Sequence, residues 1–597
     1  MCGIGGILFS TDSGEVLQKK ISRLNTLQRH RGPDGQFQKI FGMHGLCHQR
    51  LALLDAAGGQ QPLADPSGRT FIVYNGELYN YRELKEELSG RYAFQTNCDT
   101  EVVLAAYLIW GEACLDRFNG MYSFLIWDTE AESGFAARDP LGVKPFVYHY
   151  QSPTLLFASE IKALLPVLDK QPGLDEYALA EYLIAPSLSG GGPAALLKGI
   201  CYLEPGHFLR INRQGLSVHQ YYSFNWGGGA LRDGEEELTE LVGSAIEESV
   251  RLSLRADVPV GIFLSGGLDS SLIAAIAARH AGYSPKAYTI TFAQHDQIHF
   301  DPATIVNSDD LPFARELGGL LGLPFREVPA TYPSLPGMLQ QLALINDRVP
   351  VWEQEFAQHF LSRSAAQEVK AILVGDAADE THFGYFFLLK AAVNNSPLGL
   401  INQFGGQERQ WLLHPDLRRR LKPMHWLEER YRALAQQAGH CFGTSPEENI
   451  LAMSTLVYRR WLERLLHNGD IHTMHFGLEA RVPFANRSML EAACRVYPAA
   501  GYKDGVEKNV LRRAAEQWLP AAFTGRKKSS LPRDPRLGAA YQSILYALLK
   551  DRNEFVATFL DKTALIALCQ QKLISENERM TLFNVICLLY WAECYAK

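Results

Sequence analysis

Leu264-Ser265-Gly266-Gly267-Leu268-Asp269-Ser270-Ser271 is the stretch that decides the fold of the larger part of this 597-residue chain. It follows the apolar run Pro259–Phe263, which is typical of a buried strand, and it precedes a helical pattern over Ser271–Arg279. Glycines at such a turn let the backbone approach an anion, and helix-terminal amides with serine hydroxyls can hold phosphate. The stretch lacks the GxxxxGK[ST] pattern of a Walker loop. It therefore predicts a different phosphate-binding turn, the alternative being an ordinary strand–helix turn capped by serine.

The surroundings of this turn predict an α/β domain with a parallel sheet. Short apolar runs at Tyr288–Phe292 and Ala371–Val374 alternate with helical patterns such as Glu235–Leu254. The acidic cluster Gly375–Glu380 follows the second run, where open α/β sheets bind ligands, although such a cluster can also be a solvated loop. From about residue 400 onward the pattern is mostly helical.

The first part of the chain predicts sheet layers with flanking helices. Short apolar runs at Gly3–Phe9, Phe71–Tyr74 and Tyr122–Asp128 are separated by turn residues. Helical patterns interrupt them at Tyr81–Leu88 and Thr100–Trp110. We therefore expect an α+β domain here.

Three consecutive glycines mark the expected boundary between the two domains. They lie in Asn225-Trp226-Gly227-Gly228-Gly229, just before an acidic run and a charged helix start. The predicted domains are residues 1–225 and 235–597. Two domains also suit a chain of this length.

Composition limits the classes of function. The chain is 47% hydrophobic and 21% charged, with a net charge of -7, which is typical of a soluble globular protein and argues against nucleic acid as the main partner. Neither a signal peptide nor a membrane-spanning stretch is expected. Ten cysteines without a CxxC pair favour neither zinc nor disulfides, so we expect a reducing, cytoplasmic environment.

Cys2 would become the mature N-terminus once Met1 is removed. Its α-amine, with an unperturbed pKa of about 7.7–8.0, could then serve as a base beside the thiol. Such a cysteine can act as a nucleophile on a carbonyl. Position alone favours equally a buried cysteine that takes no part in chemistry.

Taken together, the motifs resemble the glutamine-dependent asparagine synthetase family over nearly the whole chain. Those in the first half resemble class II, N-terminal-nucleophile glutaminases: Cys2-Gly3-Ile4, Arg29–Gly35, His48–Leu51, Tyr74–Asn80, Asp99-Thr100-Glu101 and Arg138–Pro145. Those in the second half are the phosphate-binding turn, which resembles the PP-loop of ATP pyrophosphatases, and Gly375–Glu380, Leu478–Phe484 and Gly505–Lys508. The resemblance implies an αββα sandwich of antiparallel sheets followed by a PP-loop synthetase domain.

The resemblance implies a glutaminase site in the first domain. Cys2 would attack the side-chain amide of glutamine while its own amine moves the proton. Asn75 and Gly76 would form the oxyanion hole. Arg50 would pair with the α-carboxylate and Glu77 and Asp99 would receive the α-ammonium. The implied glutamine-binding residues are Arg50, Leu51, Asn75, Glu77 and Asp99.

The second domain would then use the ammonia, which the resemblance implies travels through an internal, largely apolar passage. ATP and a carboxylic acid would give an acyl-adenylate and pyrophosphate, and ammonia would displace AMP. Lys508 would stabilise the developing charge and Asp376 would act as a base. The implied ATP-binding residues are Leu264, Ser265, Gly266, Gly267, Asp269, Ser270 and Gly375. Asp269 and Asp379 are the candidate ligands for Mg²⁺.

Departures from the family pattern concern the acceptor acid. Asp376 occupies a position where the family usually has Glu. A gapless alignment places Glu353 where aspartate-using members have an Arg that can hold a carboxylate, although a shift of a few residues would remove this reversal. Ala485-Asn486 replaces the usual Leu-Asp, and Asp470-Ile471-His472-Thr473-Met474 replaces Asp-Arg-x-Ser-Met.

The leading hypothesis is a glutamine-hydrolysing, ATP-dependent amidotransferase that uses a specialised acid. The alternative is a housekeeping asparagine synthetase. A non-catalytic homologue and a cyclase of the β-lactam-forming type are the other hypotheses. The expected partners are glutamine, ATP and a carboxylic acid, with no nucleic acid, no membrane and a homodimer as a possible assembly. His295 and His299 could hold a metal, but such pairs are usually ordinary loop residues.

Overall fold

Two antiparallel sheets form the core of the N-terminal part in this computed structural model. The structure describes residues 2–190, 192–226, 234–292, 310–331, 334–527, 537–551 and 553–596. The first sheet has the order β10 (Ile200–Tyr202), β8 (Val147–Gln151), β9 (Thr154–Ala158), β1 (Gly3–Leu8), β3 (His44–Arg50), β2 (Gly35–Phe41). The second has the order β12 (Gly215–Gln220), β11 (His207–Asn212), β7 (Ser133–Arg138), β6 (Gly120–Asp128), β5 (Thr70–Leu78), β4 (Leu63–Ala64).

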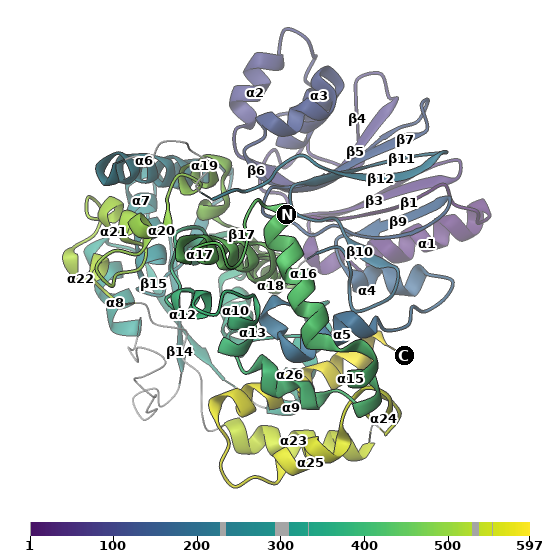
Figure 1. Ribbon diagram of the computed structural model, residues 1–597. Coiled ribbons are helices and arrows are strands. Elements are labelled where there is room, and N and C mark those ends of the chain that lie inside the picture. The colour runs from purple at the N-terminus through teal and green to yellow at the C-terminus, as the bar shows by residue number, and fades with distance from the viewer. Residues whose placement is uncertain are drawn as a thin grey trace.

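Helices cover the outer faces of the two sheets, which confirms the expected αββα layering (Figure 1). α1 (Gly14–Thr26) packs on the first sheet, and α2 (Tyr81–Leu88) and α3 (Asp99–Trp110) lie over the second. Between the sheets lies an apolar cluster that includes Ile4 and Trp127. β1 is buried along its whole length, so its glycines allow close packing, and a Cβ at Gly6 would lie 2.5 Å from the ring of Phe157.

A parallel sheet organises the C-terminal part, as the sequence predicts. Its order is β15 (Phe325–Ala330), β14 (Ala287–Phe292), β13 (Val260–Phe263), β16 (Ala371–Leu373), β17 (Glu479–Arg481). Neighbouring helices include α6 (Glu235–Ser253), α7 (Leu268–His280), α8 (Asp310–Leu320), α10 (Gln354–Ala365) and α18 (Glu463–Met474). Because the chain order reverses on the two sides of β13, the carboxyl end of this strand is a topological switch point, where such sheets bind ligands.

β15 and β17 are the strands of this sheet that the sequence analysis does not predict, and β17 is the one without a strand-like pattern. It has only three residues, two of them charged, in a region whose pattern is otherwise helical. It pairs with β16 in parallel, with Leu373 opposite Arg481. The sheet therefore extends to a strand that lies next to the N-terminal part, as the contact between Arg481 and Glu77 shows.

The rest of the C-terminal part is mainly helical. Figure 1 shows these helices below and around the parallel sheet. α26 (Glu576–Tyr595) packs against α9 (Leu335–Ile345) and α23 (Leu537–Asp551). It begins with a capping box in which the Ser575 hydroxyl accepts from the Glu578 N–H and the Glu578 carboxylate accepts from the Ser575 N–H. α16 (Pro423–Gln437) and α17 (Pro446–Leu456) pack against each other nearby.

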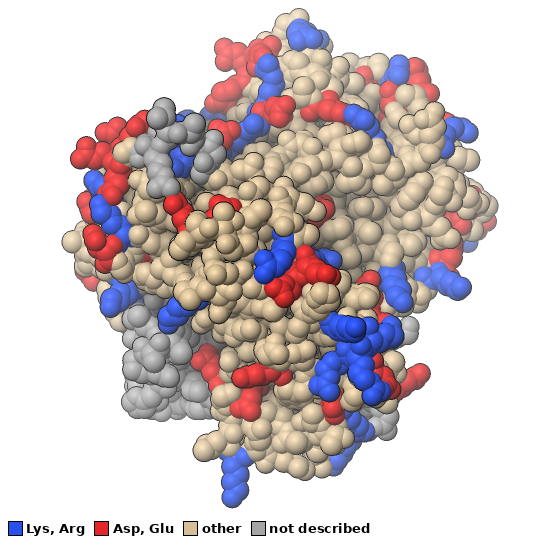
Figure 2. Space-filling model, viewed as in Figure 1, with Lys and Arg blue, Asp and Glu red and all other residues tan. Residues whose placement is uncertain are grey.

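Charged side chains of both signs share the face shown in Figure 2. The basic group over α15 (Pro415–Leu421) comes from a helix whose last turn holds three arginines. Two of these are paired: Arg419 with Asp416 and Arg420 with Glu176. None of the described helices is both long and apolar enough to cross a bilayer.

Candidate active sites

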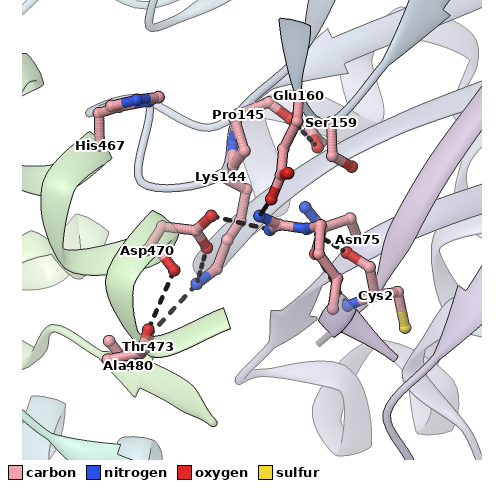
Figure 3. Close-up of polar contacts among 12 residues, drawn as sticks. Cys2, Asn75, Lys144, Pro145, Ser159, Glu160, His467, Asp470, Thr473 and Ala480 are labelled. Carbon is pink, nitrogen blue, oxygen red and sulfur yellow. Dashed lines mark hydrogen bonds and ion pairs between the residues drawn. The ribbon is translucent and has the colours of Figure 1, made fainter. Parts of the chain in front are cut away.

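A small pocket in the N-terminal part brings together the side chains expected to bind glutamine. Cys2 is buried next to β1, and its backbone N–H donates to Asn75 Oδ1 at 3.1 Å (Figure 3). The residues that line the pocket are Cys2, Arg50, Leu51, Leu53, Leu54, Gly59, Gln61, Tyr74, Gly76, Glu77, Cys98, Asp99 and Thr100. Asn75 and Gly76 lie in β5, so the expected oxyanion hole is adjacent to the expected nucleophile.

Arg50 is held at the end of β3 by backbone carbonyls. Its guanidinium donates to the carbonyl oxygens of Asp55 at 2.6 Å and Ala56 at 2.7 Å. A Cβ at Gly59 would lie 2.5 Å from Arg50 Nη2, so a larger residue there would displace the guanidinium from this position. These bonds fix a cation in the pocket wall, where it can pair with a carboxylate.

Two buried carboxylates, those of Asp99 and Glu77, are expected to bind the α-ammonium of glutamine, whereas Arg50 is expected to bind its α-carboxylate. Asp99, at the start of α3, accepts from the Leu78 N–H at 2.9 Å, and burial raises its pKa to about 6. Burial also raises the pKa of Glu77 well above its ordinary value, and Arg481 acts against that shift while Asp99 and Glu479 add to it. The pocket can therefore offer negative charge to an ammonium group only with help from nearby cations.

The Cys2 thiol is protonated at rest near neutral pH. Burial raises its pKa, and the Leu51 N–H and Arg50 only partly oppose this effect. A neutral thiol needs a base close by before it can attack a carbonyl. The α-amine that Cys2 would carry after loss of Met1 lies on the same residue and suits that task.

The second site lies at the carboxyl end of β13. Ser265 and Ser270 face each other across the turn, with their hydroxyl oxygens 2.9 Å apart. Gly266 has φ +75°, and a Cβ there would lie 2.7 Å from the Ala314 nitrogen. α7 begins at Leu268, with Gly267 as its N-cap, so it starts three residues earlier than the pattern predicts. The turn thus exposes helix-terminal N–H groups, which are suited to phosphate.

Lys508 joins the two acidic segments of this site. Its Nζ lies 2.6 Å from a carboxylate oxygen of Asp269 and 2.6 Å from one of Asp379. Burial acts to lower the pKa of Lys508, but these two carboxylates outweigh it and raise the pKa. Asp376, in the same cavity, has its pKa raised to about 6 by burial and by the charges of Asp379 and Asp269. Ala377 adopts φ +74°, a conformation that costs a non-glycine residue about 1 kcal/mol or more.

These residues surround a cavity of about 570 Å³, a volume in the range of small-ligand sites. Its lining includes Leu264, Ser265, Gly267, Asp269, Ser270, Gly375, Asp376, Asp379 and Lys508. Gly266 lies in the turn between them. Within the described ranges, no group of three or more His, Cys, Asp or Glu side chains could hold a metal ion alone. Asp269 and Asp379 nevertheless suit Mg²⁺, which commonly takes one or two carboxylates together with phosphate oxygens.

Sequence reasoning missed a set of buried charged residues between the two sites (Figure 3). Arg31 donates from Nε to the Cys2 carbonyl at 3.1 Å and from Nη2 to Asp470 at 2.7 Å. Lys144 donates to Asp470 at 3.4 Å and to the Ala480 carbonyl at 3.3 Å. Arg31 and Lys144 lie within motifs that carry the family resemblance, but nothing in the sequence shows which residue each of them contacts.

Glu353 does not line the cavity. Its carboxylate accepts from Arg579 Nη1 at 2.6 Å, and both side chains are buried. The pair joins the start of α10 to α26. A carboxylate held in this way is a structural partner of Arg579. His295 and His299, the other candidates for a ligand site, lie outside the described residues.

We expect Arg579→Met to lower the thermal unfolding midpoint markedly, because it leaves the Glu353 carboxylate buried without its cation. Removing one partner of a buried ion pair typically costs about 3–5 kcal/mol. The double variant Glu353→Gln with Arg579→Met is expected to recover part of the loss. Thermal unfolding followed by circular dichroism measures the unfolding midpoints of these variants. A double variant less stable than both single variants would contradict the prediction.

The fold and the two sites define a class of enzyme: a glutamine-hydrolysing amidotransferase joined to an ATP-using synthetase domain. The family model described as "Glutamine amidotransferase domain" matches residues 1–222, and the one described as "Asparagine synthase" matches residues 241–593. The chain belongs to the glutamine-dependent asparagine synthetase family, and it is a ligase.

Curated relatives match over almost their full lengths. "Asparagine synthetase [glutamine-hydrolyzing] 3" of Bacillus subtilis is 31% identical and covers 95% of this chain and 92% of its own. "Asparagine synthetase B [glutamine-hydrolyzing]" of Escherichia coli is 29% identical, and the match covers 88% of this chain and 81% of the relative. The match with a solved structure of glutamine PRPP amidotransferase from B. subtilis covers 64% of this chain and 76% of that chain. The identity is 16% and the TM-score is 0.28.

Proposed function

We propose that Cys2 releases ammonia from glutamine and that the C-terminal domain uses ATP to amidate a carboxylic acid other than aspartate. The observation that carries the first half is the convergence of Cys2, Arg50 and Asp99 on one pocket, with the Asn75 side chain bonded to the Cys2 N–H. The second half is supported by the cavity at β13, which combines a phosphate-binding turn with Lys508 and three carboxylates. The proposed units are residues 1–225 and 235–597.

In the proposed glutaminase step, the Cys2 amine takes the thiol proton and the sulfur attacks the amide carbon of glutamine. The Asn75 side chain and the Gly76 N–H hold the oxyanion, while Arg50 pairs with the α-carboxylate. Glu77 and Asp99 hold the α-ammonium. The leaving ammonia takes the proton, and water then releases glutamate from the thioester.

In the proposed synthetase step, the Ser265–Ser270 turn and the N-terminus of α7 hold the phosphates of ATP. Mg²⁺, when bound through Asp269 and Asp379, supplies positive charge to the pyrophosphate. Lys508 stabilises the charge that develops as the acid displaces pyrophosphate and as ammonia displaces AMP. In this proposal Asp376 accepts a proton from the attacking ammonia, and its raised pKa suits a base that works above about pH 6.

The cavity wall near Asp376 supports this proposal for the acceptor. α18 forms this wall, where Gly469 lies so close that its Cβ would be 3.4 Å from Asp376 Oδ2, and Thr473 follows one turn later. Gln358 and Leu361 of α10 line the same cavity. These side chains are uncharged, which favours an acid without the second carboxylate that aspartate carries.

The basic side chains lining the cavity mostly have carboxylate partners already. Lys508 is shared by Asp269 and Asp379, Arg512 pairs with Glu507, and Arg526 pairs with Asp310. The remaining cation of the described lining is Lys527. The competing function is asparagine synthesis, which the names of the curated relatives favour.

We expect purified enzyme with glutamine, Mg·ATP and aspartate to release glutamate but to form no asparagine above the level seen with Cys2→Ala. Amino-acid chromatography and AMP and pyrophosphate assays measure both reactions. Asparagine formed in step with AMP would establish asparagine synthesis instead. Monocarboxylic acids tested in the same way should include some that give AMP and pyrophosphate.

The proposed place of action is the cytoplasm. All ten cysteines are free. Five of them are buried at separate positions in the sequence: Cys2, Cys47, Cys98, Cys114 and Cys587. Free thiols in this number suit a reducing compartment.

A further inference from the structure

Arg481 reaches from the synthetase domain to a carboxylate of the glutamine pocket. Its Nη2 donates to Glu77 Oε1 at 2.7 Å, across 404 positions of sequence. The Arg481 side chain is fully buried, and Glu77 is 4% exposed. Glu77 lines the pocket that contains Cys2. The glutamine pocket therefore depends on a side chain from outside its own domain.

The guanidinium of Arg481 is fixed by three further partners. Its Nε donates to Glu479 at 2.5 Å, and Nη1 donates to the carbonyls of Ser253 at 3.0 Å and Arg255 at 2.6 Å. Ser253 is the last residue of α6, where unpaired helix carbonyls attract a cation. Because four of its five N–H donors are used, the group that meets Glu77 has little freedom to move.

The charge of Arg481 favours the ionised form of Glu77, while burial holds the pKa of Glu77 well above its ordinary value. Glu77 is buried, and the carboxylates of Asp99 and Glu479 are close enough to oppose its negative charge. Arg481 is the largest of the charges that act in the opposite direction. An ammonium group binds well to a buried carboxylate only when that carboxylate is charged.

The backbone of the same residue contacts the second site. The Arg481 carbonyl accepts from the Val374 N–H at 3.0 Å, and Gly375 and Asp376 follow directly. Val374, Gly375 and Asp376 line the ATP cavity, as does Ala480, the residue before Arg481. Arg481 of β17 is therefore bonded by its side chain to Glu77 in the glutamine pocket and by its main chain to Val374 in the wall of the ATP cavity.

We propose that Arg481 is a positioning residue that completes the glutamine site and links its occupancy to that of the ATP cavity. Its side chain holds Glu77 in place for the α-ammonium of glutamine, and its backbone holds the segment that ends in Asp376. A nucleotide that shifts this segment changes glutamine affinity, and by linkage glutamine changes nucleotide affinity by the same factor. The inference rests on the proposed function of the pocket.

The test is the release of glutamate by full-length enzyme carrying Arg481→Lys or Arg481→Gln. We expect the KM for glutamine to rise about 10-fold in the lysine variant, which keeps the charge but not the fork, and further in the glutamine variant. The kcat should change far less, because the Cys2 chemistry is untouched. An unchanged KM in both variants would overturn the inference.

Arg138→Lys and Arg138→Gln are the matched controls. Arg138 is also a buried arginine that crosses between the domains, pairing with Glu463 at 3.2 Å, but it does not line the glutamine pocket. We expect these variants to lose thermal stability without raising the KM for glutamine. An equal rise in KM in both pairs of variants would show a general effect of the domain interface and would overturn the role of Arg481.

A second measurement uses the wild-type enzyme, so it does not depend on the folding of any variant. The KM for glutamine is measured with and without the magnesium complex of α,β-methylene-ATP. We expect a change of at least about twofold, lost in Arg481→Lys; an unchanged KM in the wild type would contradict the link. Wild-type enzyme that releases no glutamate at all would instead contradict the proposed function.

Discussion

Replacing Cys2 with alanine is expected to lower glutamate release from glutamine by a factor of about 10⁴ or more. The variant has no sulfur at the position next to the Asn75 side chain from which to attack the amide. The thermal midpoint should change little, because the substitution removes one atom from a residue that is already small. Coupled glutamate dehydrogenase detection measures the rate.

Two controls make this prediction specific. Cys201→Ala removes a half-buried thiol of β10 that does not line the pocket, and it should leave glutamate release intact. The Cys2→Ala enzyme should also bind Mg·ATP as the wild type does in calorimetry. Glutamate release at the wild-type rate would show that another group is the nucleophile. Intact mass of the wild type should lack Met1, since the base is the amine of Cys2.

Lys508→Met is expected to lower ATP-dependent formation of AMP and pyrophosphate by about 10²–10³-fold. The loss removes the cation that joins Asp269 to Asp379 and that would face charge developing on the transferred group. It also leaves two carboxylates close together in a buried site, which weakens binding of the triphosphate. Pyrophosphate release, measured with an acid that the wild type accepts, gives the rate.

Lys503→Met is the matched control for this variant. Lys503 lies in the same segment, but it forms a surface ion pair with Glu235 and does not line the cavity. Such surface pairs contribute about 0–1 kcal/mol, so the control should keep both activities. Glutamate release without ATP should survive in both variants. A Lys508→Met enzyme with normal pyrophosphate release would remove Lys508 from the proposed mechanism.

Apolar periodicity and glycine-rich turns are local signals, so the sequence predicts strands close to β1, β5 and β6 and the turn after β13. The arrangement of the N-terminal strands in two antiparallel sheets is what the family resemblance implies. The helical pattern predicts a start at Ser271, whereas α7 begins at Leu268. The N-cap glycine and the charged first turn make α7 start earlier. β17 escaped prediction because three residues with two charges carry no strand pattern.

The contacts that join the two sites could not be predicted, since they connect residues hundreds of positions apart. Charged side chains are normally exposed, so Arg31, Lys144 and Arg481 carry no sign of burial in the sequence. Glu353 shows the opposite problem. Alignment suggested a role at the acceptor site, whereas its partner Arg579, 226 positions away, makes it part of the helical scaffold.

The ion pairs that cross between the domains bear on how such enzymes can be recombined. Arg31 and Lys144 from one half meet Asp470 from the other, and Glu77 meets Arg481 in the reverse sense. A chimaera that grafts a foreign amidotransferase half onto this synthetase half must reproduce that alternating pattern of signs. A graft that lacks it would bury like or lone charges at the seam, at a cost of several kcal/mol for each. An exchange of either half must therefore keep matching partners for the ion pairs that cross between the two halves.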